Sequence, residues 1–119
     1  MYSANLLDHF EHPRNAGELA EATATARVEN PACGDILELS VKTTAGRIAD
    51  IRFRAKGCVP SLACASAITE LVKGRLLAEA RELRAEDVAR AVGQLPPTSG
   101  HAARLAIDAL QAVLKLPQK

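Results

Sequence analysis

Apolar and polar residues alternate along residues 36–42 and again along residues 47–54. A period of two predicts β-strands that are buried on one face. Gly46, between the two segments, suits the positive φ of a tight turn. We therefore predict a β-hairpin in which Thr44 pairs with Arg47. The apolar positions expected on its buried face are Leu37, Leu39, Val41, Ala49, Ile51 and Phe53.

Beyond this hairpin the apolar spacing changes to three and four residues, which predicts helices. The first begins near Pro60 and ends before Gly74. Two short helices are expected over residues 76–83 and 85–92, and a break at Leu95-Pro96-Pro97 separates them from a last helix capped by Thr98 or Ser99. The buried stripe of the first of these helices comprises Ser61, Cys64, Ala65, Ile68, Leu71 and Val72, and that of the last comprises Ala103, Ile107, Leu110, Val113 and Leu114.

The N-terminal part predicts a short helix and one more strand. Ser3 can cap a helix over residues 5–11, and residues 23–29 form a weakly hydrophobic strand that suits the edge of a sheet. The apolar side expected for this helix is Leu6, Leu7 and Phe10. The element order predicts one domain over residues 1–119, of the α+β class: a three-stranded antiparallel sheet with helices packed on one face.

The amino-acid composition argues against several classes of protein. The net charge is +1 and the 119 residues include one tyrosine, two phenylalanines and no tryptophan. Without a basic run or a stacking platform we expect no nucleic-acid partner. We also expect no membrane span and no signal segment, hence a cytoplasmic protein. Three cysteines, an odd number, favour reduced thiols over a disulfide framework.

The candidate chemistry lies in two short motifs, Asn30-Pro31-Ala32-Cys33-Gly34-Asp35 and Gly57-Cys58. They flank the predicted hairpin, whose register sets Cys33 opposite Cys58 and brings Asp35 close to both. Cys58 precedes a helix, where the dipole favours a thiolate. Two thiols and a carboxylate that converge on a turn indicate a metal or sulfur site.

Three further residues are weighed as ligands. Cys64 lies on the apolar stripe, which favours a packing role, but it is less than two helical turns beyond Cys58 and stays a candidate. His101 falls at the start of the last helix, while His9 and His12 are expected at the surface. Two thiolates, an imidazole and a carboxylate fill a tetrahedral zinc site, and thiolates equally suit an iron–sulfur cluster.

Over nearly its whole length the chain resembles the IscU/NifU-type iron–sulfur cluster assembly scaffolds. The resemblance rests on the two cysteine motifs and on further segments in matching order. These are Tyr2-Ser3, Asp8-His9-Phe10, Pro13-Arg14-Asn15-Ala16-Gly17, Lys56, Thr69-Glu70-Leu71-Val72-Lys73-Gly74, Leu95-Pro96-Pro97 and His101.

The resemblance implies a scaffold rather than an enzyme. Such a scaffold receives sulfur from a cysteine desulfurase, holds a [2Fe–2S] cluster transiently and passes it to acceptor proteins, and many members bind zinc without a cluster. The residues that match the family's ligand set are Cys33, Asp35, Cys58 and His101.

The chain departs from the family pattern at two places. Ala102 stands where the third family cysteine follows the histidine, so Cys64 becomes a candidate replacement. Thr98-Ser99 replaces the Val-Lys that accompanies a dedicated chaperone, which argues against chaperone handover. Two alternatives stay open: a zinc-binding sulfur relay, and a metal-free relative that binds partners. The sequence leaves the oligomeric state open.

Overall fold

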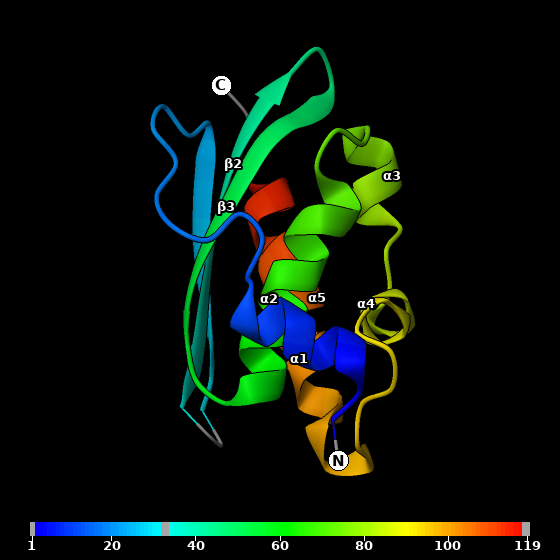
Figure 1. Cartoon of the computed structure of the whole chain (residues 1–119). Coiled ribbons are helices and arrows are strands. Elements are labelled where there is room, and N and C mark those ends of the chain that lie inside the picture. Colours follow the sequence, from blue (N-terminus) through cyan, green and yellow to red (C-terminus); the bar gives the residue numbers. More distant parts are fainter. Residues whose placement is uncertain (1, 32–33, 118–119) are drawn as a thin grey trace.

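The computed structural model describes residues 2–31 and 34–117. Three strands form an antiparallel sheet in the order β1-β2-β3, and the helices gather on one of its faces (Figure 1). This arrangement confirms the expected α+β class. In chain order the elements are α1 (Ala4–Glu11), β1 (Ala24–Asn30), β2 (Asp35–Thr44), β3 (Arg47–Lys56), α2 (Val59–Val72), α3 (Leu77–Arg81), α4 (Ala85–Ala91), the 3-10 turn η1 (Pro97–Ser99) and α5 (Gly100–Lys115).

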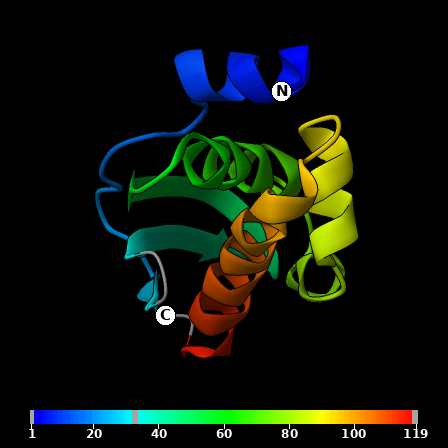
Figure 2. The same cartoon turned by 90° about the horizontal axis from the view of Figure 1, so that it is seen from below.

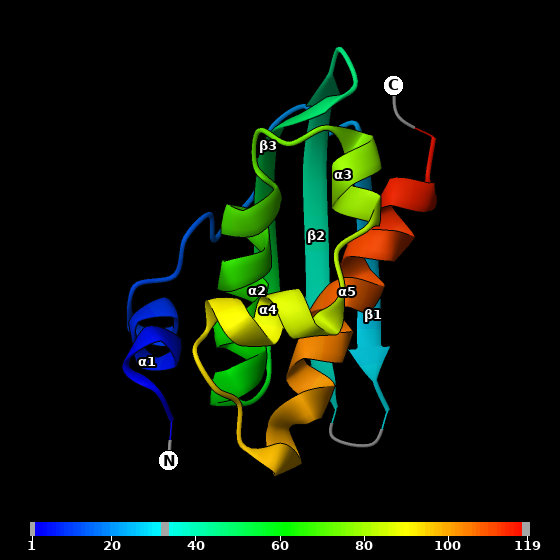
Figure 3. The ribbon, with the colours of Figure 1, turned by 90° about the vertical axis from the view of Figure 1, so that its right-hand side faces the viewer.

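Two helices supply most of the layer that covers the sheet. α2 packs against β3, and α5 crosses β1 and β2 obliquely (Figure 3). α1 packs beside α2, on the side away from α5 (Figure 2). Within residues 2–31 and 34–117, no helix combines the length and the apolar character needed to cross a bilayer.

The helix α2 is buried around most of its circumference, not along one stripe as the spacing predicts. Neighbours surround it, since it contacts α1, α4, α5 and β3. Small side chains at Ala63, Ala65, Ser66 and Ala67 let these neighbours approach closely, and all four are buried. The N-terminal end of α2, which carries Cys58, is therefore held in a fixed place relative to the sheet.

The predicted apolar side of α1 is only partly correct. Leu6 is buried as expected, but Leu7 and Phe10 are 39% and 36% exposed, and His9 is buried in their place. The His9 ring reaches α2, where its Nδ1 lies 2.8 Å from Ser66 Oγ. The expectation that His9 is a surface residue is therefore wrong, because a hydrogen bond to α2 satisfies its ring.

The hairpin register agrees with the prediction only near the turn. Thr44 faces Arg47 as expected, but the ladder shifts by one residue between Thr43 and Lys42. Ala49 is the extra residue of this bulge, so Ile48 points into the core and Ala49 is exposed. The shift continues to the start of β2, where Ile36 faces Lys56. Periodicity alone does not detect such an insertion, because each half of the strand still alternates.

Candidate metal centre

Three chemically active side chains from separate parts of the chain meet at one end of the sheet. Asp35 is the first residue of β2, Cys58 immediately precedes α2, and His101 lies in the first turn of α5. One ligand atom from each of the three lies within 4.8 Å of the other two. The carboxylate, thiol and imidazole expected from the sequence therefore do converge, although they belong to three different elements.

The Asp35 carboxylate is fixed by hydrogen bonds from the start of α2. Ser61 Oγ donates to Oδ2 at 2.6 Å, and the backbone N–H of Cys58 donates to Oδ1 at 3.3 Å. Asp35 is only 4% exposed, so these bonds replace the water that a carboxylate would otherwise bind. Asp35 thus links the start of β2 to the N-terminus of α2 and fixes the geometry of the site.

Gly57 leaves the space that this arrangement needs. A Cβ atom at Gly57 would lie 2.3 Å from Asp35 Oδ1 and 2.6 Å from Cγ, far inside van der Waals contact. Its φ of +157° is also one that residues with a side chain rarely adopt. The Gly57-Cys58 pair therefore forms a unit in which the glycine admits the carboxylate and the cysteine presents the thiol.

The Cys58 thiol lies between the other polar groups. Its Sγ is 3.3 Å from Asp35 Oδ2, 3.2 Å from Ser61 Oγ and 3.8 Å from His101 Nε2. His101 Nε2 is itself 3.6 Å from Asp35 Oδ2. Cys58 and His101 both lie at helix N-termini, where the backbone dipole favours negative charge. The site is therefore suited to hold thiolates and an anionic metal–sulfur group.

The structure places one of the two other candidate cysteines, Cys64, and it lies outside this cluster. Cys33 lies outside the described residues. Cys64 is fully buried in the core, and burial, with a smaller contribution from Cys58, raises the pKa of its thiol to about 12. This placement favours the packing interpretation of Cys64, and its role as a ligand stays a prediction. Ala102, at the position of the missing family cysteine, is also buried.

The contact of Ser61 with the site was not expected from the sequence, where Ser61 is only part of an apolar stripe. Its hydroxyl donates a hydrogen bond of 2.6 Å to Asp35. The sequence feature that indicates a role for Ser61 at the site is its position three residues after Cys58, because residues at that spacing lie on the same side of the first helical turn. The carboxylate partner, 26 residues away in β2, could only come from the tertiary structure.

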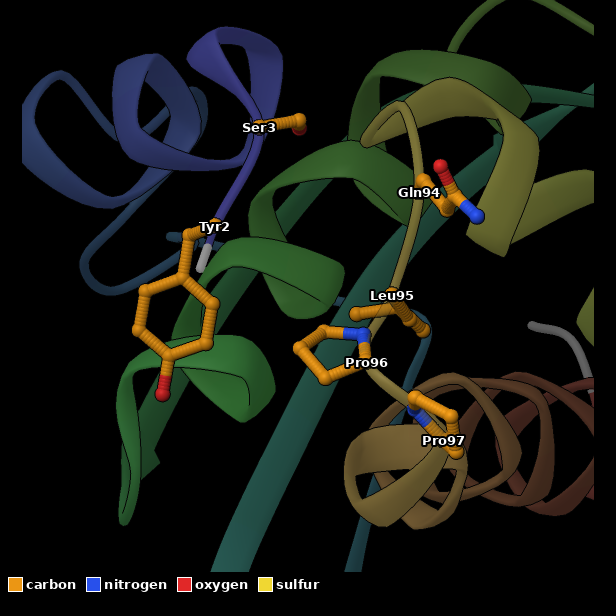
Figure 4. Close-up of a pocket in the computed structure, with 6 residues that line it drawn as sticks. All are labelled: Tyr2, Ser3, Gln94, Leu95, Pro96 and Pro97. Atoms are coloured by element: carbon orange, nitrogen blue, oxygen red, sulfur yellow. The ribbon is translucent and has the colours of Figure 1, made fainter.

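Not every hollow on the surface includes residues of this cluster. One of about 370 Å³ lies between the residues before α1 and those before η1 (Figure 4). Apart from the Tyr2 phenol it has no titratable lining, so it offers little chemistry. Its lining consists of Tyr2, Ser3, Gln94, Leu95, Pro96 and Pro97. A smaller hollow of about 220 Å³ does include His101, together with the end of β1 and one side of α5.

A small α+β domain that gathers a thiol, an imidazole and a carboxylate at two helix N-termini is a metal- or sulfur-handling domain. The chain belongs to the family of NifU-like N-terminal domains, whose family model matches residues 1–119. This agrees with the resemblance found in the sequence motifs.

Relatives with known names are iron–sulfur cluster assembly scaffold proteins. The chain is 40% identical over 114 residues to the iron–sulfur cluster assembly scaffold protein IscU 1 of Archaeoglobus fulgidus, covering 96% of this chain and 74% of the relative. It is 39% identical over 117 residues to IscU of Escherichia coli K12, covering 95% of this chain and 91% of the relative.

The fold also matches a solved structure. A protein from Fervidobacterium islandicum AW-1, described as a candidate cluster assembly scaffold of the SUF system, superimposes with a TM-score of 0.81. The match covers 96% of both chains at 21% identity, so it shows a shared fold.

Proposed function

We propose that this protein is a scaffold for iron–sulfur cluster assembly that holds a [2Fe–2S] cluster transiently. One observation carries the proposal: a thiol, an imidazole and a carboxylate lie within 4.8 Å of one another at an accessible end of the fold. Membership of the NifU-like family and the named IscU scaffolds among its relatives support it. The cluster is cargo and not a resident cofactor, and the protein is not an enzyme.

The proposed ligands are Cys33, Asp35, Cys58 and His101. Thiolates bind iron strongly, whereas a carboxylate oxygen binds it less strongly. The Asp35 carboxylate already accepts hydrogen bonds from Ser61 and from the Cys58 backbone, and these compete for its lone pairs. Asp35 is therefore the weakest ligand of the set, and this weakness allows the cluster to be released.

The proposed partners are a cysteine desulfurase, which supplies sulfur, and acceptor proteins, which take the finished cluster. With alanine at position 102, the incoming sulfur must reach another thiol. Cys58 is accessible at the surface, whereas Cys64 is buried and its raised pKa keeps it protonated. We therefore assign the sulfur-accepting role to Cys58 together with Cys33. A cytoplasmic location stays a prediction.

A zinc-bound form is the second candidate, because sulfur, nitrogen and oxygen donors also satisfy tetrahedral zinc. In that form the protein would relay sulfur through one thiolate. A metal-free, purely partner-binding relative is disfavoured by the convergence of Asp35, Cys58 and His101, which such a module would not need.

The proposal is tested by loading the protein anaerobically with iron and sulfide and following transfer of the cluster to an apo-ferredoxin. The wild-type protein should take up a cluster and release it to the acceptor, and Cys58→Ser should fail to retain one. Asp35→Ala should hold its cluster longer and transfer it more slowly, whereas Glu82→Ala, at an exposed carboxylate directly after α3, should behave as wild type. Faster cluster loss from Asp35→Ala would contradict the role of Asp35.

A further inference from the structure

The two edges of the sheet differ in how their backbone groups are satisfied. At the β3 edge, Phe53 donates its N–H to Asn15 O and accepts from Gly17 N–H, both at 2.9 Å. Ile48 of the same edge is bonded to Gly74 and Arg75. Loops from the same chain therefore cover much of this edge.

The β1 edge has no such cover in the described part of the chain. In an antiparallel sheet, the backbone groups of successive residues point alternately to one neighbouring strand and to the other. Because the backbone groups of Phe53 point away from β2, those of Leu39, which faces Phe53, point toward β1 and bond to Ala26. The alternate residues Thr25, Arg27 and Glu29 must then direct theirs away from the sheet. Among residues 2–31 and 34–117, no backbone group bonds to these three on the outer side.

The same edge carries two opposite charges that have no ion pair with any residue the structure describes. Arg27 and Glu29 are both exposed, and their side chains lie on the solvent face of β1. Several other charges on this face are paired, as with Arg54 and Glu38 at 3.0 Å and Lys42 and Glu21 at 3.6 Å. An unpaired edge strand is a template for another strand, and its charges decide which strand fits.

We propose that β1 is a self-association surface, on which two copies of this chain pair their β1 strands antiparallel about Val28. In this register Arg27 lies opposite Glu29 of the partner subunit, and Glu29 lies opposite Arg27 of the partner subunit. Both pairs use the outward backbone groups, so each is a hydrogen-bonded pair whose side chains are neighbours. The contact is isologous, as a two-fold dimer requires, and it joins two sheets into one of six strands.

The charges of Arg27 and Glu29 favour this register over the neighbouring registers. A shift by one residue on each strand centres the pairing on Arg27 or on Glu29, and then two like charges face each other across the axis. Centring on Ala26 leaves Glu29 without an opposite charge. Only the register about Val28 satisfies both charges of both copies, which favours a second copy over an unrelated strand.

The contact reaches the neighbourhood of the metal centre. Glu29, Asn30 and Pro31 line one wall of the hollow that contains His101. Pairing at β1 would place Arg27 of the partner subunit at that wall. The inference does not rest on the proposed function, since it concerns the chain without metal.

The test is sedimentation velocity on the full chain in chelator and reductant, at protein concentrations from about 10 μM to 1 mM. One added strand on each side buries less surface than a standard interface of about 1,600 Å², so we expect a dimer only toward the upper concentrations. Arg27→Glu and Glu29→Arg should each weaken the dimer about tenfold or more, because two attractive pairs become repulsive. The double variant R27E/E29R should restore wild-type association.

Lys56→Glu is the matched control, because it makes the same charge change at an exposed position of β3, the opposite edge strand. It should leave the dimer unchanged, and circular dichroism should show all variants folded. A monomer at every concentration would overturn the proposal. So would a dimer that R27E does not weaken, one that K56E weakens as much as R27E, or a double variant that fails to recover.

Discussion

The contact between Gly57 and Asp35 gives the sharpest prediction for the architecture of the site. In Gly57→Ala the new methyl group would overlap the Asp35 carboxylate, with Oδ1 at 2.3 Å and Cγ at 2.6 Å. The carboxylate must move, and it then gives up the hydrogen bonds from Ser61 at 2.6 Å and from the Cys58 N–H at 3.3 Å.

The expected loss of stability follows from these two bonds. A hydrogen bond to a charged group contributes about 1.5–3 kcal/mol. The longer bond lies at the low end of this range, and water can replace part of the loss on the side of Cys58. We therefore expect the free energy of unfolding to fall by about 2–4 kcal/mol. At about 4 °C per kcal/mol for a domain of this size, Tm should fall by about 8–16 °C.

The assay is urea denaturation followed by circular dichroism, in chelator and reductant so that no metal contributes. Gly46→Ala is the matched control, because Gly46 also has a positive φ, of +75°, but no atom lies within 4 Å of its Cβ position. It should cost only the backbone strain of about 1–2 kcal/mol. The same Gly57→Ala change in an Asp35→Ala background should cost at least about 1 kcal/mol less than in wild type. Additive effects of the two substitutions would refute the steric reasoning.

Three further predictions concern single side chains. Ser61→Ala should weaken zinc binding about tenfold or more through loss of the hydrogen bond that orients Asp35, as measured by chelator competition, and unchanged affinity would contradict that role. Iodoacetamide at pH 8 should modify Cys58 in the folded protein but leave Cys64 unmodified, because burial raises the pKa of Cys64 to about 12; peptide mass spectrometry that finds both equally labelled would disprove its burial. Burial, together with the charge of Arg14, lowers the pKa of His9 below its ordinary value of 6.5. Between the lowered and the ordinary pKa the unfolded chain binds more protons, so stability should be fully present above about pH 6.5 and fall as the pH decreases through the folded-state pKa. His9→Asn should flatten this slope in urea titrations at several pH values, and an unchanged slope would assign it to other groups.

The sequence predicted the structure best where a local pattern allows only one interpretation. Alternation located β2 and β3 to within a few residues, and the Gly57-Cys58 motif indicated the start of α2 correctly. It was less informative where tertiary contacts decide. The bulge at Ala49 is invisible to a period of two, and His9 is buried because Ser66 of α2 offers it a hydrogen bond.

The same division holds for the site. Asp35, Cys58 and His101 were all expected from their motifs, and the structure brings them together. Their common geometry depends on Ser61 and on the close approach at Gly57, which link elements far apart in the chain. A sequence pattern names the side chains that carry chemistry, but the hydrogen bonds that aim them depend on how β2 meets α2.

The central claim is that this site assembles an iron–sulfur cluster although alanine stands at position 102. The most direct measurement is the iron, zinc and acid-labile sulfide content of anaerobically purified protein after reconstitution, together with its visible spectrum. We predict near-stoichiometric iron and sulfide with a brown chromophore, lost in Cys58→Ser and retained in Cys64→Ala. Bound zinc without sulfide under the same conditions would contradict the claim and favour the zinc-dependent sulfur relay.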